Sequence, residues 1–248
     1  MGNHQRCWIW GRHAVVEMIR AARWPAHEVL LADDLPADER EELSLLLATQ
    51  SVPVRIEPSA VLARQCGAAG HQGFAAKMEP FPLEDAETGL AGDQPPISLI
   101  LDSIQDAFNY GAILRSAEAL GIGAVYVGRQ GQAEVSSQVA RSSAGAVNHL
   151  RLMESQDLKA TLKTLRSRGV QLVAASERGA QSCGVFRFSF PTAIVIGSEG
   201  SGIRRELLQL CDCSVAIPLT GQVSSLNAAV AAGIVLYEAA RQKKAGPS

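Results

Sequence analysis

Short apolar runs alternate with longer amphipathic segments over most of the chain. The runs at 97–101 and 193–196 are rich in Ile, Leu and Val. The first leads into polar residues, and the second leads into glycines and polar residues. Segments with helical spacing of apolar positions separate such runs. Strands that are apolar along their whole length are typical of a parallel sheet covered by helices on both faces. The pattern predicts an α/β domain with a mostly parallel sheet over residues 95–248.

The elements expected in this domain are strands at 97–103, 123–128, 170–176, 192–198 and 214–219, and helices at 109–121, 136–147, 158–169, 202–211 and from 224 onward. Residues 1–79 repeat the alternation on a smaller scale and predict a small α/β domain. Its expected elements are helices at 14–22, 37–51 and 58–66 and strands at 28–33 and 52–58. Between the two domains, residues 80–94 carry four acidic side chains and no basic one, and prolines flank them. This composition predicts a linker.

Composition narrows the class of protein. Hydrophobic residues make up 47% of the chain, which is enough for ordinary cores, and no apolar run approaches the roughly 20 residues that a membrane span needs. The first residues lack the apolar stretch of a signal peptide, so we expect a cytoplasmic protein without a membrane anchor. The five cysteines form no Cys-x-x-Cys pair, and we expect neither disulfides nor a metal site.

The charge is unevenly distributed along the chain. The net charge is −2, but residues 95–248 carry 15 basic and 11 acidic side chains. This excess of positive charge permits nucleic-acid binding without requiring it.

Polar residues follow three of the expected strands, where ligands collect in open parallel sheets. After the first strand come Asp102, Asn109, Gly111 and Arg115. Asn109 lies near the start of the next helix and Arg115 about one and a half turns further on, so both side chains can reach the loop. The alternative is that Asn109 only caps the helix and Arg115 is a surface charge.

The second place is Gly-Ser-Glu-Gly-Ser-Gly at 197–202, directly after a buried strand. Three glycines in six residues allow positive φ angles and a close approach of a ligand to the backbone. The spacing differs from the Gly-x-Gly-x-x-Gly of dinucleotide-binding proteins, and no suitable acidic residue follows about 20 positions later. A nicotinamide cofactor is therefore the weaker interpretation.

The third place lies between the last strand and the last helix. Pro218 ends the strand, Gly221 permits a tight bend, and Ser224, Ser225 and Asn227 surround the helix start. One of these side chains suffices to cap the helix. The others are free to hold a ligand.

Together the three segments resemble those of the SpoU, or TrmH-like, branch of the SPOUT RNA methyltransferases. The family has an Asn-x-Gly with an Arg six residues after the Asn, a Gly-x-Glu-Gly strand end and an Ile-Pro-Met-x-Gly-x-x-x-Ser-Leu-Asn-Val segment. Here they stand at 109–115, 197–200 and 217–228, with Leu219 in place of Met and Ala228 in place of Val. The N-terminal part resembles the L30e-like substrate-binding domain of rRNA-modifying members in its segments at 10–19 and 71–76. The likeness is greatest to the bacterial 23S rRNA guanosine 2′-O-methyltransferases.

The resemblance implies an α/β domain with a trefoil knot and a homodimer with its active site at the subunit interface. It implies S-adenosylmethionine as cofactor, bound by the backbone at Gly197, Ile217 and Leu226, and RNA as substrate. It implies that Arg115 is the catalytic arginine, acting as a phosphate clamp or as a base. Because a guanidinium stays protonated, the clamp is the favoured role.

The remaining polar residues receive supporting roles by the same resemblance. Asn109 would orient Arg115 or the ribose, Glu199 would anchor Arg115 or Asn227, and Ser225 with Asn227 would hold the loop and the nucleotide. For RNA phosphates the candidates are Arg141, Arg151, Arg204 and Arg205, each with plain surface charge as the alternative. His71 and Gln72 would either contact RNA or stabilise the end of the small domain.

Three other functions compete with the methylation of 23S rRNA. The same activity could act on tRNA, or the chain could be a non-catalytic RNA-binding protein. A nicotinamide oxidoreductase is the third alternative. Binding of S-adenosylmethionine, together with mapping of ribose methylation, separates all of them.

Overall fold

The computed structural model describes residues 7–48, 51–222 and 225–245, and it divides into two compact units. The first unit comprises Met1–Pro82 together with Glu134–His149, and the second comprises Leu83–Ala133 and Leu150–Ser248. A segment from the middle of the chain is thus folded into the N-terminal unit.

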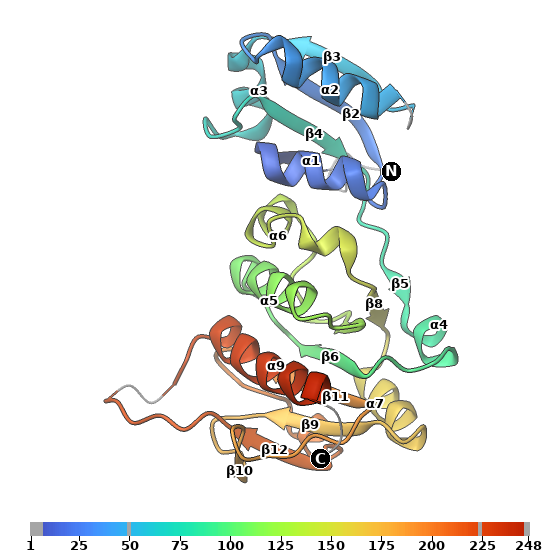
Figure 1. Cartoon of the computed structure of the whole chain (residues 1–248), viewed down its shortest axis with the longest axis vertical. Helices are drawn as coiled ribbons and strands as arrows, with labels where there is room; N and C mark the ends of the chain where they lie inside the picture. Colours follow the sequence, from blue (N-terminus) through green and yellow to red (C-terminus); the bar gives the residue numbers. More distant parts are fainter. Residues whose placement is uncertain (1–6, 49–50, 223–224, 246–248) are drawn as a thin grey trace. The chain divides into compact units, whose positions relative to one another are not determined.

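The first unit is built on a four-stranded sheet with the strand order β1-β4-β2-β3. β4 lies antiparallel to both β1 and β2, whereas β3 is parallel to β2. The strands are β1 (Cys7–Trp10), β2 (Ala26–Ala32), β3 (Val54–Glu57) and β4 (Phe74–Met78), and the helices are α1 (Arg12–Ala21), α2 (Ala37–Ala48) and α3 (Ser59–Cys66). Figure 1 shows them in blue and teal. Alternate residues of the strands contribute to two separate apolar clusters, one on each face of the sheet.

The segment Glu134–His149, from the middle of the chain, packs against strand β1 of this unit. It forms helix α6 (Ser137–Ser142) and a short 3₁₀ helix, η2 (Ala146–His149). α6 packs along β1, and its Ala140 joins the larger apolar cluster. Because β1 is at the end of the strand order, α6 covers a strand that would otherwise offer a free edge.

The second unit contains an eight-stranded sheet with the order β10-β12-β9-β11-β6-β7-β8-β5. All its recorded pairings are parallel, which confirms the predicted α/β class. The strands are β5 (Glu84–Asp85), β6 (Ile97–Asp102), β7 (Ala124–Gly128), β8 (Leu152–Ser155), β9 (Gln171–Ala175), β10 (Gln181–Ser182), β11 (Thr192–Gly197) and β12 (Cys213–Ala216).

Helices cover both faces of this sheet. One face packs against α4 (Ala86–Ala91), α7 (Leu158–Ser167) and α8 (Arg205–Leu208), and Ile100 and Val195 of the central strands join that cluster. α5 (Ala107–Ala119) and α9 (Ala228–Ala245) pack on each other, and α9 also packs on β9 and β11 (Figure 1). The central strands β6 and β11 are therefore buried almost along their whole length, as their apolar runs predict.

The structure corrects several expected elements. Residues 80–94, which the sequence predicts as a linker, contain regular structure. β5 pairs with β8, Asp85 caps the start of α4, and the amide of Gln94 donates to carbonyl groups near the end of α4. The helix expected at 202–211 is reduced to α8, and strands β1, β4 and β8 were not predicted. These strands are short, so their two-residue periodicity is weak.

Helix α9 is hydrogen-bonded to the loop at residues 186–188 through a cluster of polar and charged side chains. Glu238 accepts hydrogen bonds from Arg241 at 2.7 and 2.9 Å and from the amide of Gln242 at 2.7 Å. Gln242 in turn binds the backbone of Phe186 and Phe188. The hydrogen bond from Arg241 is the main cause that lowers the pKa of Glu238 to about 2.

Replacing Glu238 by Gln is expected to lower the free energy of unfolding at pH 7 by about 1 kcal/mol, because Arg241 loses its charged acceptor. In the wild type this contribution is complete above the ordinary pKa of a glutamate and is lost as the pH falls toward 2. The difference between the two proteins should therefore shrink below about pH 4.5. Chemical denaturation at several pH values measures it, and a constant difference down to pH 2 would contradict the assignment.

Candidate functional site

Two of the three predicted segments start from neighbouring strands of the sheet. β11 and β6 pair in parallel, and their last residues, Gly197 and Asp102, are partners in the register. The loops that follow both strands therefore leave the same edge of the sheet at the same level. The third segment reaches this edge through the start of helix α9, which packs on α5 and β11.

A single carboxylate joins the three segments. Oε1 of Glu199 accepts hydrogen bonds from Nδ2 of Asn109 at 2.6 Å and from Nδ2 of Asn227 at 2.7 Å. Nδ2 of Asn227 also donates to Oδ1 of Asn109 at 2.9 Å. Residues separated by up to 118 positions in the sequence thus form one closed triangle of polar contacts.

The backbone determines the orientation of the Asn227 amide. Oδ1 of Asn227 accepts from the N–H groups of Ala229 at 2.9 Å and Val230 at 3.2 Å, so this side chain caps α9. The NH₂ group must then point away from the helix, toward Glu199. One residue therefore both starts the helix and holds the triangle. Ser224, the other predicted candidate at this position, lies outside the described residues.

Asn109 is not the cap of α5, so the part of the alternative interpretation that concerns Asn109 is wrong. Asp106 is the cap, and its Oδ1 accepts from the backbone N–H of Asn109 at 2.8 Å. The side chain of Asn109 is consequently free to reach Glu199.

The glycine-rich loop folds back on itself. Ser198 and Gly202 form two backbone hydrogen bonds, at 2.9 and 3.2 Å, and Gly202 has a φ of 66°. A Cβ on Gly197 would lie 2.1 Å from the carbonyl carbon of Gly202. The sequence predicted a glycine that lets a ligand approach, but the missing side chain of Gly197 first makes room for the protein's own backbone.

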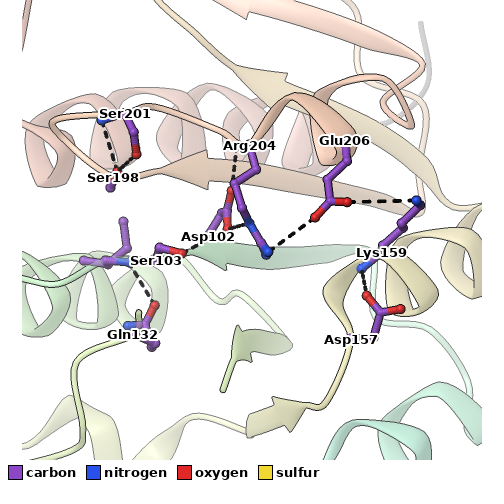
Figure 2. A network of polar contacts seen from close by, with 10 residues as sticks. Asp102, Ser103, Gln132, Asp157, Lys159, Ser198, Ser201, Arg204 and Glu206 are labelled. Carbon is purple, nitrogen blue, oxygen red and sulfur yellow. Dashed lines mark hydrogen bonds and ion pairs between the residues drawn. The ribbon is translucent and has the colours of Figure 1, made fainter. Parts of the chain in front are cut away.

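An ion pair between a buried carboxylate and an exposed arginine fixes the far end of this loop (Figure 2). The side chain of Asp102 is fully buried, and it accepts from the backbone N–H and from Nε of Arg204, both at 2.7 Å. No role for Asp102 was predicted from the sequence. An acidic residue at the end of a wholly apolar strand was the available signal, because buried carboxylates need a partner.

Arg115 lies on α5 and is exposed. Its side chain forms no hydrogen bond or ion pair with any residue in the described part of the chain. The predicted catalytic arginine is thus on the helix that carries Asn109, six residues further on and about 9 Å along the helix axis. Its guanidinium is available to a ligand or to another chain.

Between β12 and α9, backbone groups that have no partner among the described residues lie beside apolar side chains. The backbone groups of Leu219–Gln222, Ser225 and Leu226 form no hydrogen bond with a described residue. Leu219 and Leu226 keep 41% and 37% of their surface exposed, while Ile217 is half-buried. Free N–H and C=O groups next to exposed apolar surface suit a ligand with a heterocyclic base.

Two predicted RNA-contacting residues have structural roles in the first unit. His71 is buried, and its Nδ1 accepts from the backbone N–H of Gly73 at 3.1 Å. Oε1 of Gln72 accepts from the N–H of Arg12 at 3.0 Å, which satisfies the start of α1 where Gly11 offers no capping side chain.

The predicted RNA-binding arginines differ in their partners. Arg151 pairs with Glu84 at 3.2 Å, and the guanidinium of Arg141 lies 4.8 Å from the ring centre of Trp10. Arg204 pairs with Asp102, whereas Arg205 is exposed and has no partner among the described residues. Arg205 is therefore the member of the set with an unengaged charge.

Neither the thiols nor any acidic cluster adds chemistry to the site. Burial raises the pKa of Cys7 and Cys66 to about 11 and that of Cys211 to about 12, so these thiols are protonated and weakly nucleophilic at neutral pH. Over the described ranges, His, Cys, Asp and Glu do not gather in groups of three that could hold a metal ion. Within the same ranges no helix has the length and hydropathy of a membrane span.

Comparison with known families accounts for most of the chain. Residues 96–237 match the family model of the SpoU rRNA Methylase family, and residues 8–83 match the model described as RNA 2′-O ribose methyltransferase substrate binding. A 23S rRNA (guanosine-2′-O-)-methyltransferase from Photobacterium profundum is 32% identical over 95% of this chain and 98% of its own length. A tRNA/rRNA methyltransferase of Mycobacterium sp. (strain KMS), described as uncharacterized, is 35% identical over 95% of this chain and 76% of its own.

A solved structure shares the architecture. The SpoU methyltransferase AviRb from Streptomyces viridochromogenes, crystallised in complex with AdoMet, superposes with a TM-score of 0.81 and is 27% identical. The likeness extends over 98% of this chain and 92% of that protein. It includes both the parallel sheet and the N-terminal unit.

Alanine at position 197 is expected to destabilise the protein by about 1–3 kcal/mol, because its Cβ would overlap the backbone at Gly202 and Ile203. Gly200 in the same loop is the matched control, since a Cβ there would meet nothing within 4 Å. Thermal unfolding of Gly197→Ala and Gly200→Ala measures the difference. Equal stability of the two variants would contradict the packing of this loop.

Proposed function

This chain belongs to the SpoU rRNA methylase family, and we propose that it transfers the methyl group of S-adenosylmethionine to a ribose 2′-hydroxyl of RNA. One observation carries the proposal: Glu199 joins Asn109 and Asn227, one residue from each of the three family segments. A nicotinamide oxidoreductase does not account for this convergence. Nor does a decayed, non-catalytic RNA-binding protein, which would have no need to keep it.

The residues at the strand ends suit S-adenosylmethionine. Gly197, Ile217 and Leu226 would hold it. The backbone groups of Leu219–Gln222, which have no partner in the described part of the chain, would face its base, and the exposed leucines would cover it. The cofactor supplies an electrophilic methyl group on a sulfonium. The chain's part is to hold this group in line with the ribose oxygen and to keep the reacting atoms at bonding distance.

Arg115 would act on the RNA rather than on the protein. Its guanidinium is exposed and unpaired within the described chain, so it can donate two parallel hydrogen bonds to a phosphate. This clamp would place the adjacent ribose hydroxyl. Because the guanidinium remains protonated, it would also stabilise the negative charge that develops on the ribose oxygen as the hydroxyl passes its proton to solvent water.

The triangle around Glu199 would keep the site in shape. Its hydrogen bonds fix the amides of Asn109 and Asn227, and with them the starts of α5 and α9. Ser225 is exposed and has no partner in the described chain, so its hydroxyl is available to the nucleotide. The triangle would thus stabilise the protein, whereas Ser225 would contact the RNA.

A guanosine of 23S rRNA is the substrate we favour. The relative from Photobacterium profundum that carries this activity matches over nearly its whole length, including the substrate-binding region. Such a substrate implies a cytoplasmic enzyme. tRNA is the alternative, and it has the support of the joint tRNA/rRNA description of the mycobacterial relative.

We also propose that the enzyme works as a homodimer. Val230, Ile234 and Tyr237 of α9 are 51%, 38% and 58% exposed, and their spacing puts them on one face of the helix. Phe108 of α5, which packs on α9, is 63% exposed. A second copy that covers this apolar face would also bring its own groups toward Arg115.

Arg115→Ala is expected to lower kcat for methylation of 23S rRNA by about 100-fold or more, with little change in the Kd of S-adenosylmethionine. Incorporation of labelled methyl groups and calorimetry measure the two quantities. Arg168→Ala, at an exposed arginine of the same unit, is the control. Unchanged kcat in Arg115→Ala would refute the assigned chemistry, and a wild type that binds no cofactor would favour a non-catalytic RNA-binding protein.

Mapping of ribose methylation distinguishes the two RNA substrates. Deletion of the gene is expected to remove one 2′-O-methylated guanosine from 23S rRNA and to leave tRNA unchanged. Loss of a tRNA methylation instead would reassign the substrate without changing the reaction.

Ile234→Glu is expected to convert a dimer into a monomer, because it places a charge in the covered apolar face, and to reduce methylation with it. Sedimentation at micromolar concentration measures the mass. Lys163→Glu, an exposed position on α7, is the control and should remain dimeric. A wild type that sediments as a monomer would contradict the dimer.

A further inference from the structure

The loop that would carry the cofactor is fastened at its far end by a pair of residues outside the triangle around Glu199. Asp102 ends β6, and Arg204 lies two residues beyond the last glycine of the loop. Figure 2 shows the carboxylate of Asp102 directed at both the backbone and the side chain of Arg204. This geometry belongs wholly to the second unit.

The two carboxylate oxygens of Asp102 accept hydrogen bonds from different groups of Arg204. Oδ2 accepts the backbone N–H of Arg204 at 2.7 Å, and Oδ1 accepts its Nε at 2.7 Å. The hydroxyl of Ser103 adds a third donor to Oδ1 at 3.3 Å. A fully buried carboxylate with three donors binds one backbone position of the loop tightly.

The position of Arg204 is transmitted to Gly197 by direct contact. The backbone of Gly202 and Ile203, which immediately precedes Arg204, lies so close to Gly197 that no Cβ would fit. Fixing Arg204 therefore fixes the backbone that supports Gly197. The same loop carries Glu199 between these two points.

The charge of Arg204 is already used within the protein. Besides Asp102, its Nη1 contacts Glu206 at 3.4 Å, and Glu206 also pairs with Lys159 at 3.9 Å. These four side chains carry no net charge together. A phosphate gains little at such a site, whereas the adjacent Arg205 is exposed and has no partner within the described chain.

We propose that Asp102 and Arg204 are positioning residues for the cofactor, acting as one unit that holds the loop 197–203 in its binding conformation. This assignment rests on the proposed function. It separates two adjacent arginines, both predicted from the sequence to bind RNA: Arg204 serves the cofactor through the loop, and Arg205 serves the RNA.

Arg204→Gln and Arg205→Gln form the matched pair that tests the assignment. Arg204→Gln should raise the Kd and the KM of S-adenosylmethionine by about tenfold, which corresponds to 1.4 kcal/mol, and leave the KM of RNA and its salt dependence unchanged. Arg205→Gln should show the reverse: unchanged cofactor affinity, a higher KM of RNA and a shallower salt dependence. Calorimetry and steady-state kinetics at several salt concentrations measure these quantities.

The double variant tests whether the two residues act together. Asp102→Asn should weaken cofactor binding as Arg204→Gln does, and the combination should be no weaker than either alone, because one unit is lost only once. Independent, additive losses would contradict the pairing. A general loss of structure would instead lower kcat and raise the KM of S-adenosylmethionine and the KM of RNA together.

Arg204→Lys covers the case in which the other variants unfold. It retains a positive charge beside the buried Asp102 but loses the planar Nε–H donor, so cofactor affinity should lie between that of the wild type and of Arg204→Gln. A folded Arg204 variant that binds S-adenosylmethionine within about twofold of the wild type overturns the inference. A wild type without cofactor binding overturns the proposed function itself.

Discussion

The parallel register of β6 and β11 is the constraint on which the site depends. Because Asp102 and Gly197 are partners in that register, the loops after both strands start from one edge. Asn109 and Glu199 can then meet although they are 90 positions apart in the sequence. A shift of either strand would separate them, and a shift by one residue would also exchange the side chains that the strand presents to the helices on the two faces. Core packing and site geometry are thus secured by the same pairing.

The sequence predicted the class of fold and the residues that converge, and it missed how they are connected. Asn109, Glu199 and Asn227 were recognisable because they follow apolar strands in a pattern that resembles a known family. The sequence did not indicate that Asp106 caps α5 and so releases the side chain of Asn109. It also missed the partner of Asp102, since an ion pair between residues 102 positions apart depends on which strands are neighbours. The trefoil knot stays a prediction, because strand order does not specify how a chain is threaded. The roles of the site residues also stay predictions.

Three residues that the sequence singled out as functional candidates also support the backbone. Gln72 satisfies the start of α1, and His71 binds the N–H of Gly73. Gly197 gives space to the returning loop. In each case a nearby backbone segment requires a hydrogen-bond partner or space. Which segment lies nearby is decided by the three-dimensional structure and cannot be read from the sequence. Arg115 and Ser225, by contrast, have side chains with no partner among the residues that the structure describes, and their polar groups are available to a ligand.

The first unit draws its residues from two separate stretches of the sequence. Helix α6, which covers strand β1, is encoded between two strands of the other unit. Exchange of this unit between genes as a single contiguous block would therefore leave the edge of its sheet uncovered, and an uncovered edge recruits strands from other molecules. The architecture thus favours inheritance of the two units as one gene, with substrate recognition changed by point substitution rather than by replacement of the module.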